Sequence, residues 1–149
     1  MGVARALIRI NAPQSVVWTI LADFGGLSKW SPLVITSTSI SPMNQGPNSE
    51  RAYDMQMLGS LTETAIEWEE GTGYTVQVKG VASLPYLTTK MSLSEQGGQT
   101  VVLAESELRG NEPELETMGR KIKGILQVTL QGLKEYVETG RKMPSPPIS

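Results

Sequence analysis

A single long helix is the strongest structural prediction from this sequence. Between Glu114 and Thr139, apolar residues recur at steps of three and four positions, which is the period of one face of an α-helix. That face comprises Leu115, Met118, Ile122, Ile125, Leu126, Thr129, Leu133, Tyr136 and Val137. Glycines at three interior positions each cost up to about 1 kcal/mol relative to alanine. The helix must therefore be stabilised by packing of its apolar face against the rest of the chain.

The flanking residues indicate where this helix begins and ends. Asn111 is a candidate N-cap, because its side-chain oxygen can accept a hydrogen bond from a free backbone N–H of the first turn. Gly140 is the expected stop, because glycine readily adopts the left-handed conformation that closes many helices. We therefore predict one helix over 114–139.

Apolar and polar residues alternate in most of the preceding chain, which is the pattern of β-strands. Residues 3–10 form the first expected strand, and two short helical segments follow over 13–21 and 24–30. Six further strands are expected over 33–40, 50–57, 61–69, 74–80, 84–93 and 100–108. This order predicts an α+β fold. We expect the seven strands to form one antiparallel sheet. Strand twist accumulates across a sheet of this size, so the sheet should curve and wrap around the long C-terminal helix.

The length of 149 residues suits one domain, which we expect to span residues 3–140. Residues 141–149 contain three prolines and are expected to form a flexible tail. No apolar stretch is long enough to cross a membrane, and the first residues lack the pattern of a signal peptide. We therefore expect a soluble, cytoplasmic protein.

The composition excludes several kinds of chemistry. The chain has no cysteine and no histidine, so it cannot form disulfides, use thiolate or imidazole groups, or build the usual zinc sites. We expect no metal and no cofactor. The net charge is −2 and no basic run is present, which argues against nucleic acid as a partner.

Two segments carry a resemblance to a known superfamily. VVWTILADFGGLSKWSPL, after the first strand, and TVVLAESEL, before the final helix, resemble the START-like (SRPBCC, helix-grip) superfamily, and within it the polyketide cyclase/dehydrase and lipid-transport family. The resemblance covers residues 3 to about 140. It implies a cavity between the curved sheet and the long helix that takes small hydrophobic or amphipathic molecules. The superfamily includes carriers, receptors, cyclases and chaperone activators, so the fold alone does not define a function.

Four shorter segments, LTET, PYLTTKMSL, ESEL and VTLQGLKEYVE, are similar to the abscisic acid receptors of plants. This similarity implies pocket-facing positions for Glu63, Tyr86, Thr88, Glu105, Ile125 and Thr129. The loops that close the receptor pocket differ here. Residues 58–60 replace a gate that contains proline, and residues 81–84 replace a latch that contains histidine.

Strand alternation leaves two interpretations for the glutamates. Glu63 shares a strand face with Leu61 and Ala65, so its carboxylate either points into a cavity or lies on an exposed face. In the last strand, simple alternation places Glu105 outside. A bulge near Ala104 would bring it back to the cavity.

The strand over 84–93 leaves the same choice for a polar row. Tyr86, Thr88 and Lys90 share one of its faces. If this face lines the cavity, Lys90 needs a partner, and Glu63 is the candidate. If the row is instead the solvated convex face, the opposite face carrying Leu87, Met91 and Leu93 lies inside.

The candidate ligand-binding residues combine these arguments with two further positions. Trp30 either covers the mouth of the cavity or belongs to the core, and Met118 suits an adaptable pocket or a core equally well. The full set is Trp30, Glu63, Val76, Val78, Tyr86, Thr88, Lys90, Glu105, Met118, Ile122, Ile125 and Thr129. No residue is assigned a catalytic role.

The main functional hypothesis is binding or transport of a small hydrophobic or amphipathic molecule, similar to a lipid or a polyketide. An alternative is an enzyme of the aromatase/cyclase type that uses Glu63, Tyr86 or Lys90 for proton transfer. A weaker alternative is a protein-interaction module whose groove takes an apolar segment of a partner.

Overall fold

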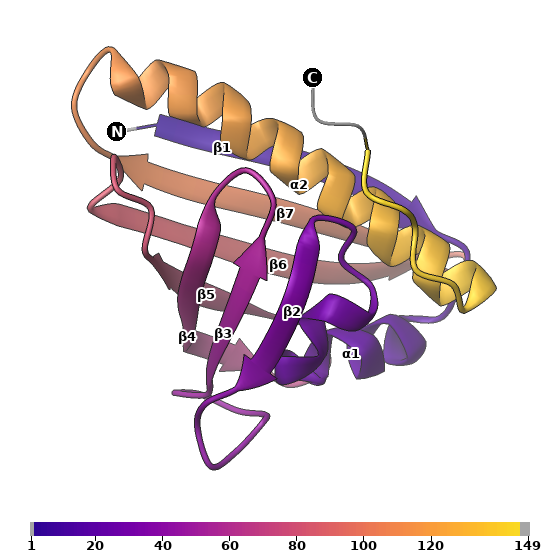
Figure 1. Ribbon diagram of the computed structural model, residues 1–149. Helices are drawn as coiled ribbons and strands as arrows, with labels where there is room; N and C mark the ends of the chain where they lie inside the picture. The colour runs from indigo at the N-terminus through magenta and orange to yellow at the C-terminus, as the bar shows by residue number, and fades with distance from the viewer. Residues whose placement is uncertain (1, 147–149) are drawn as a thin grey trace.

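A curved sheet wraps around one face of a long helix in the computed structural model, which describes residues 2–146 (Figure 1). The elements are β1 Gly2–Ile10, α1 Gln14–Ala22, the 3-10 helix η1 Phe24–Lys29, β2 Val34–Ser39, β3 Glu50–Met55, β4 Gly59–Glu69, β5 Gly73–Lys79, β6 Tyr86–Gln96, β7 Gln99–Arg109 and α2 Glu114–Thr139. The strand order is β1-β7-β6-β5-β4-β3-β2, and all neighbours are antiparallel. The predicted fold class, with seven strands, two short helices and one long final helix, is confirmed.

The long helix α2 has the predicted bounds, but its beginning differs from expectation. Its end is closed by Gly140, which has a φ of 75° and donates its N–H to the carbonyl of Tyr136 at 2.8 Å. The expectation that Asn111 is the N-cap was wrong. The helix begins after Pro113 without a side-chain cap, and Asn111 contributes only its backbone carbonyl, which accepts from Leu115 N at 2.9 Å. None of the helices between residues 2 and 146 combines the length and hydrophobicity needed to cross a membrane.

The three glycines inside α2 have different surroundings. A Cβ atom at Gly132 would overlap the ring of Pro32, so glycine allows the segment between η1 and β2 to pack directly against the helix. Gly119 and Gly124 face no heavy atom that a Cβ would touch. Packing therefore explains one of these glycines and not the other two.

The core lies between the concave face of the sheet and α2. The strands contribute alternate residues, as β7 illustrates with Val102, Ala104, Ser106 and Leu108, which are all buried. α2 buries Leu115, Ile122, Leu126, Leu130 and Leu133 against this face. The short helices α1 and η1 lie together beside the C-terminal half of α2 and close that end of the fold (Figure 1).

An aromatic cluster connects the two short helices to the sheet. It consists of Trp18, Phe24, Trp68 and Tyr74, and five of its six ring pairs have centroids 5.3 to 6.3 Å apart. The indole N–H groups of Trp18 and Trp68 donate to the two carboxylate oxygens of Glu70, at 3.0 and 2.8 Å. The hydrogen bonds from Trp68 and Trp18 lower the pKa of Glu70, because both favour its ionised form.

The described part of the C-terminal tail forms neither helix nor strand, and Lys142 bonds it to the sheet. The Lys142 ammonium donates to the carbonyl of Val34 at 2.9 Å, and burial lowers the pKa of Lys142. The predicted flexible tail extends to residues 147–149, which lie outside the described residues.

Candidate ligand-binding site

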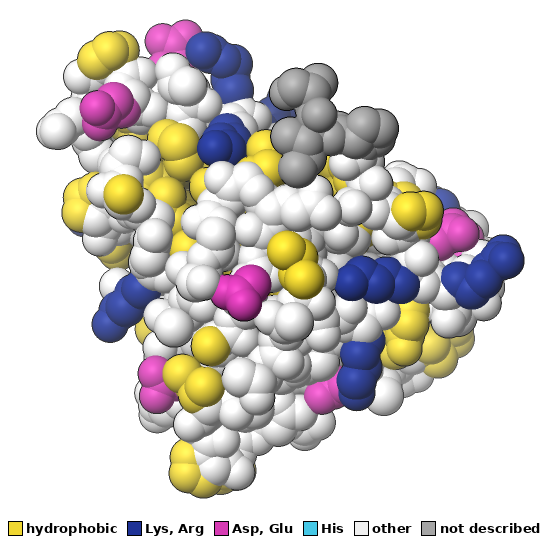
Figure 2. All heavy atoms as spheres, viewed as in Figure 1, with side chains coloured by type: hydrophobic (Ala, Val, Ile, Leu, Met, Phe, Trp, Pro, Cys, Tyr) yellow, Lys and Arg dark blue, Asp and Glu magenta, His cyan; other side chains and the backbone are white. Residues whose placement is uncertain are grey.

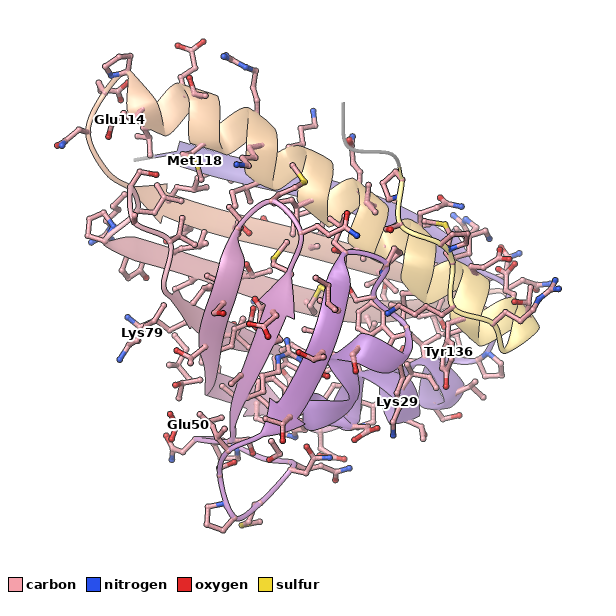
Figure 3. All side chains as sticks on the ribbon, in the orientation of Figure 1. Lys29, Glu50, Lys79, Glu114, Met118 and Tyr136 are labelled. Carbon is pink, nitrogen blue, oxygen red and sulfur yellow. The ribbon has the colours of Figure 1, made fainter. Side chains whose placement is uncertain are left out.

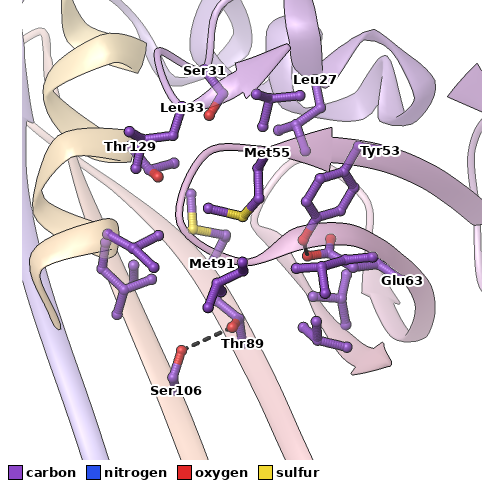
Figure 4. A pocket seen from close by; sticks show the side chains of 18 of the residues that line it. Leu27, Ser31, Leu33, Tyr53, Met55, Glu63, Thr89, Met91, Ser106 and Thr129 are labelled. Carbon is purple, nitrogen blue, oxygen red and sulfur yellow. Dashed lines mark hydrogen bonds between the residues drawn. The ribbon is translucent and has the colours of Figure 1, made fainter. Parts of the chain in front are cut away.

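A cavity of about 100 Å³ lies between the concave face of the sheet and α2 (Figure 4). Strands β3 to β7, the segment between η1 and β2, and the middle of α2 all contribute to its wall. Most of the lining is apolar and includes Leu27, Leu33, Met55, Leu61, Val76, Met91 and Ile122. On the surface, Figure 2 shows hydrophobic side chains gathered between α2 and the sheet at upper left, while charged side chains of both signs are scattered over the rest of this face.

The volume limits what this conformation can hold. Pockets for drug-sized ligands usually measure about 300–1,000 Å³, and an apolar cavity of roughly 150 Å³ is known to accept benzene. The cavity is therefore closer to the size of one small ring. Met55 and Met91 line it, and thioether side chains repack readily around different shapes. A larger ligand requires such side chains to move.

A buried ion pair forms one wall of the cavity. Arg51 on β3 lies directly opposite Glu63 on β4 in the sheet register. Its Nε and Nη2 atoms both donate to Glu63 Oε1, at 2.9 and 2.5 Å. The exposed fractions of the two side chains are only 6% and 9%. Removal of two charges from water is costly, so each partner depends on the other for compensation.

Tyr53 completes this polar cluster, which we call the Arg51–Tyr53–Glu63 triad. It lies two residues after Arg51 on the same face of β3, and its hydroxyl donates to Glu63 Oε2 at 2.5 Å. Figure 4 shows the Tyr53 hydroxyl and the Glu63 carboxylate meeting at the cavity wall. Both oxygen atoms of the carboxylate are therefore engaged by protein donors.

Two members of the aromatic cluster, Phe24 and Tyr74, pack near the Arg51 guanidinium. The Arg51 guanidinium lies 4.0 Å from the centroid of the Phe24 ring and 5.9 Å from that of Tyr74. Its Nη1 atom also donates to the backbone carbonyl of Phe24 at 3.0 Å. A guanidinium on an aromatic face gains a cation–π attraction that is larger when water is excluded. The position of Arg51 is therefore fixed by Glu63 on one side and by Phe24 on another.

The charges of the triad shift the ionisation of its members. Burial by itself lowers the pKa of Arg51, but the charge of Glu63, its hydrogen bonds and the neighbouring Tyr74 and Tyr53 together offset this and hold the pKa above its ordinary value. Burial raises the pKa of Tyr53 well above 10.0, and the neighbouring Glu63 charge adds to the effect. Burial also raises the pKa of Tyr74. At neutral pH the arginine is charged and both tyrosines are neutral.

Uncharged hydroxyl groups supply most of the remaining polar lining. Thr89 on β6 and Ser106 on β7 share a hydrogen bond of 2.8 Å on the floor of the cavity (Figure 4). Ser31 and Thr129 line it from the segment before β2 and from α2. The cavity thus combines an apolar wall, a few hydroxyls and one internally compensated ion pair.

The structure brings seven of the candidate residues to this cavity. They share positions on the concave face of the sheet, on α2 or in the segment before β2, and they are Trp30, Glu63, Val76, Val78, Ile122, Ile125 and Thr129. Leu61, Glu63 and Ala65 are all buried, so the face of β4 that carries Glu63 points inward. Glu63 was the candidate partner for Lys90 if the polar row of β6 lined the cavity, but in the structure its partner is Arg51.

The polar row of β6 lies outside the cavity. Leu87, Thr89 and Met91 line it, so the alternate residues Tyr86, Thr88 and Lys90 belong to the convex face. Thr88 is buried there, Lys90 is exposed, and the ring of Tyr86 lies 4.5 Å from the Arg109 guanidinium. The solvated interpretation of this row is therefore the one that the structure supports.

Glu105 and Met118 also lie outside the cavity lining. The pairing of β7 with both neighbouring strands is continuous, so the bulge considered near Ala104 is absent. Glu105 consequently points to the convex face, where it pairs with Arg5 at 2.8 Å. Met118 is half-buried near the beginning of α2 (Figure 3) and packs against the core one turn before the residues that line the cavity.

Two members of the triad were missed from the sequence. Arg51 and Tyr53 alternate with Glu50, Ala52 and Asp54, and Met55 continues their face, which was a signal that they point inward. The short β3–β4 connection would then have placed Arg51 opposite Glu63. A buried arginine is uncommon, and only this register argument could have identified it.

The curved antiparallel sheet, the long helix lying in it and the cavity between them define the class of START-like, helix-grip domains. The sequence matches the family described as polyketide cyclase/dehydrase and lipid transport over residues 1–138, and the chain belongs to that family. No curated protein matches the sequence significantly.

Solved structures share this fold at low sequence identity. An uncharacterised protein from Bacillus thuringiensis has a TM-score of 0.79 and 13% identity, and the match covers 92% of this chain and 99% of that one. A START superfamily protein from Mycobacterium smegmatis has a TM-score of 0.73 and 14% identity, with coverage of 91% and 97%. Truncated norcoclaurine synthase from Thalictrum flavum also has a TM-score of 0.73 and 14% identity, with coverage of 93% and 94%. At these identities the similarity defines the fold only.

Proposed function

We propose that this protein binds a small, largely apolar molecule in the cavity between the sheet and α2. One observation carries the proposal: an apolar cavity in the core contains a compact set of polar groups on one wall. Apolar lining supplies affinity through burial, and a few fixed polar groups orient the ligand. Membership of a family that includes lipid-transport proteins supports the same function.

The arrangement favours binding over proton-transfer chemistry. Of the residues considered for such chemistry, Tyr86 and Lys90 lie on the convex face, away from the cavity. Glu63 does line the cavity, but Arg51 and Tyr53 engage both of its oxygen atoms. A carboxylate held in this way is not free to take a proton from a substrate. We therefore propose a binding protein and assign no reaction.

Titration of the full chain with toluene, followed by backbone amide NMR spectra, tests the proposal. Toluene is a single apolar ring of the size that the cavity suggests. Saturable shifts are expected in residues that line the cavity, such as Val76, Met91 and Ile125. Absence of any saturable change up to the solubility limit of toluene would contradict the proposal.

A pair of variants separates binding in the cavity from binding at the surface. Ala104 lines the cavity and is 1% exposed, so Ala104→Leu fills part of the volume and should weaken toluene binding. Extra methyl groups in a packed core typically cost about 1–3 kcal/mol, so the variant should still fold. Ser94→Leu, at an exposed position of β6 outside the cavity lining, is the control and should leave binding unchanged.

A further inference from the structure

We infer that the Arg51–Tyr53–Glu63 triad makes the cavity selective for a neutral ligand that carries a hydroxyl group, and that it rejects the corresponding carboxylate. This inference rests on the proposed function and specifies the ligand class of the same cavity. The chemistry that it selects is that of a phenol or a small alcohol attached to an apolar body.

The charge balance of the lining is the first argument. Arg51 and Glu63 are the charged residues among those that line the cavity, and they compensate each other in direct contact. The other polar side chains of the lining, such as Ser31, Thr89 and Thr129, are uncharged. A ligand carboxylate would lose its hydration and find no free cation, which is strongly unfavourable for a buried charge.

The fixed position of Arg51 is the second argument. Its Nε and Nη2 atoms donate to Glu63, its Nη1 atom donates to the Phe24 carbonyl, and its plane lies against the Phe24 ring. To bind a ligand carboxylate, the guanidinium would have to leave Glu63. That movement would leave a second buried carboxylate without a partner, so one favourable contact would be exchanged for an uncompensated charge.

The direction of the Tyr53 hydrogen bond is the third argument. Its proton points to Glu63 Oε2, so the hydroxyl oxygen retains only the role of an acceptor toward other groups. The complementary ligand group is therefore a donor, such as O–H. A ligand hydroxyl that donates to Tyr53 would extend the chain of hydrogen bonds to Glu63, and members of such chains strengthen one another.

Three probes of one ring each test this selectivity: toluene, phenol and benzoate, titrated into the full chain at neutral pH. Phenol is then neutral and benzoate is charged. Phenol is expected to bind about fivefold more tightly than toluene, as for one net hydrogen bond. Benzoate is expected to bind at least about tenfold more weakly than toluene, because its charge is not compensated.

Two tyrosine variants test whether the Tyr53 hydroxyl is the group that recognises the ligand hydroxyl. Tyr53→Phe keeps the ring, removes the hydroxyl that accepts from the ligand, and leaves Glu63 Oε2 without its donor. The ratio of the phenol affinity to the toluene affinity should therefore differ from the ratio in the unchanged chain. Tyr86→Phe removes a hydroxyl from the convex face and should preserve the preference for phenol. Amide NMR spectra establish that both variants are folded. If Tyr53→Phe did not fold, the ranking of the three probes on the unchanged chain would still decide the inference.

The outcomes distinguish this inference from the proposed function. Tight binding of benzoate, or equal binding of phenol and toluene by the unchanged chain, would overturn the inference while toluene binding sustained the proposed function. A ratio of phenol affinity to toluene affinity that was the same in Tyr53→Phe as in the unchanged chain would also overturn it. If none of the three probes bound, both the proposed function and the inference would be overturned.

Discussion

Two arginine–glutamate pairs lie on opposite faces of the same sheet, and they have the same arrangement in the strand register. In each pair the two residues are directly opposite each other on neighbouring antiparallel strands, Arg51 with Glu63 on β3 and β4, and Arg5 with Glu105 on β1 and β7. The inner pair has exposed fractions of 6% and 9%, whereas those of the outer pair are 65% and 32%. The pairs share their place in the strand register, but they differ in environment and in the number of hydrogen bonds between the partners, two in the inner pair and one in the outer pair.

The difference in exposure implies that the same register in the sheet does not give two ion pairs the same contribution to stability. Water and dissolved ions surround the outer pair, so loss of one partner is largely compensated by solvation. The inner pair has no such compensation, because the protein has replaced the water around both charges. Two further hydrogen bonds stabilise the buried charges: the Tyr53 hydroxyl donates to Glu63, and Arg51 donates to the Phe24 carbonyl. Variants of the two pairs measure this difference.

The largest effect is expected for Glu63→Gln, which leaves Arg51 buried without a partner charge. The free energy of unfolding should fall by about 3–5 kcal/mol, measured by urea denaturation at neutral pH. The double variant Arg51→Met with Glu63→Leu removes both charges and should lose much less. If the double variant lost as much as the single one, packing rather than charge would explain the effect.

Tyr53→Phe is expected to have the next largest effect. The substitution removes a hydrogen bond to a charged group, which typically contributes about 1.5–3 kcal/mol to the free energy of unfolding. Urea denaturation measures the loss, with Tyr86→Phe on the convex face as the matched control. Equal losses in the two variants would mean that the inner hydroxyl has no special role.

Alkaline pH should lower the free energy of unfolding through the two buried tyrosines of the concave face, Tyr53 and Tyr74. The pKa values of Tyr53 and Tyr74 are raised above 10.0 in the folded protein, so their contribution to stability is complete below pH 10. Above pH 10 the two tyrosines ionise in the unfolded chain while they remain neutral in the folded protein. The free energy of unfolding should therefore fall by about 1.4 kcal/mol per pH unit for each tyrosine. Urea denaturation at several alkaline pH values measures this slope. Tyr53→Phe should reduce it, and an unchanged slope would exclude Tyr53 as a source.

The smallest effect is expected for Glu105→Gln in the outer pair. The free energy of unfolding should fall by no more than about 1 kcal/mol, and the loss should shrink further in high salt, which screens exposed charges. Urea denaturation with and without added salt measures both quantities. A loss comparable to that of Glu63→Gln would break the distinction between the two pairs.

Local patterns in the sequence were sufficient for the fold and for part of the site. The helical period from Glu114 to Thr139 and the alternation of the strands predicted every element within a few residues. Alternation also grouped Glu63 with Leu61 and placed Glu105 outside. For Glu105, where the similarity to abscisic acid receptors implied the cavity, the alternation of the strand gave the correct face, because one residue of displacement turns every side chain to the other face. For Tyr86 alternation left both faces open, and only the structure places it on the convex face.

The rest of the site depends on contacts between distant parts of the chain. Arginine side chains are usually exposed. The burial of Arg51 follows only from the pairing of β3 with β4 and from its contact with Phe24, which belongs to η1. The volume of the cavity depends on how the side chains of six strands and α2 fit together. No local pattern contains that information.

The close contact between Pro32 and Gly132 has a consequence for sequence variation. The proline ring occupies the space that a side chain at position 132 would need, although the two residues are far apart in the chain. In related sequences with this packing, the two positions should covary: a larger residue at 132 should occur only with a smaller one at 32. Gly119 and Gly124 have no such neighbour, so their positions should vary independently.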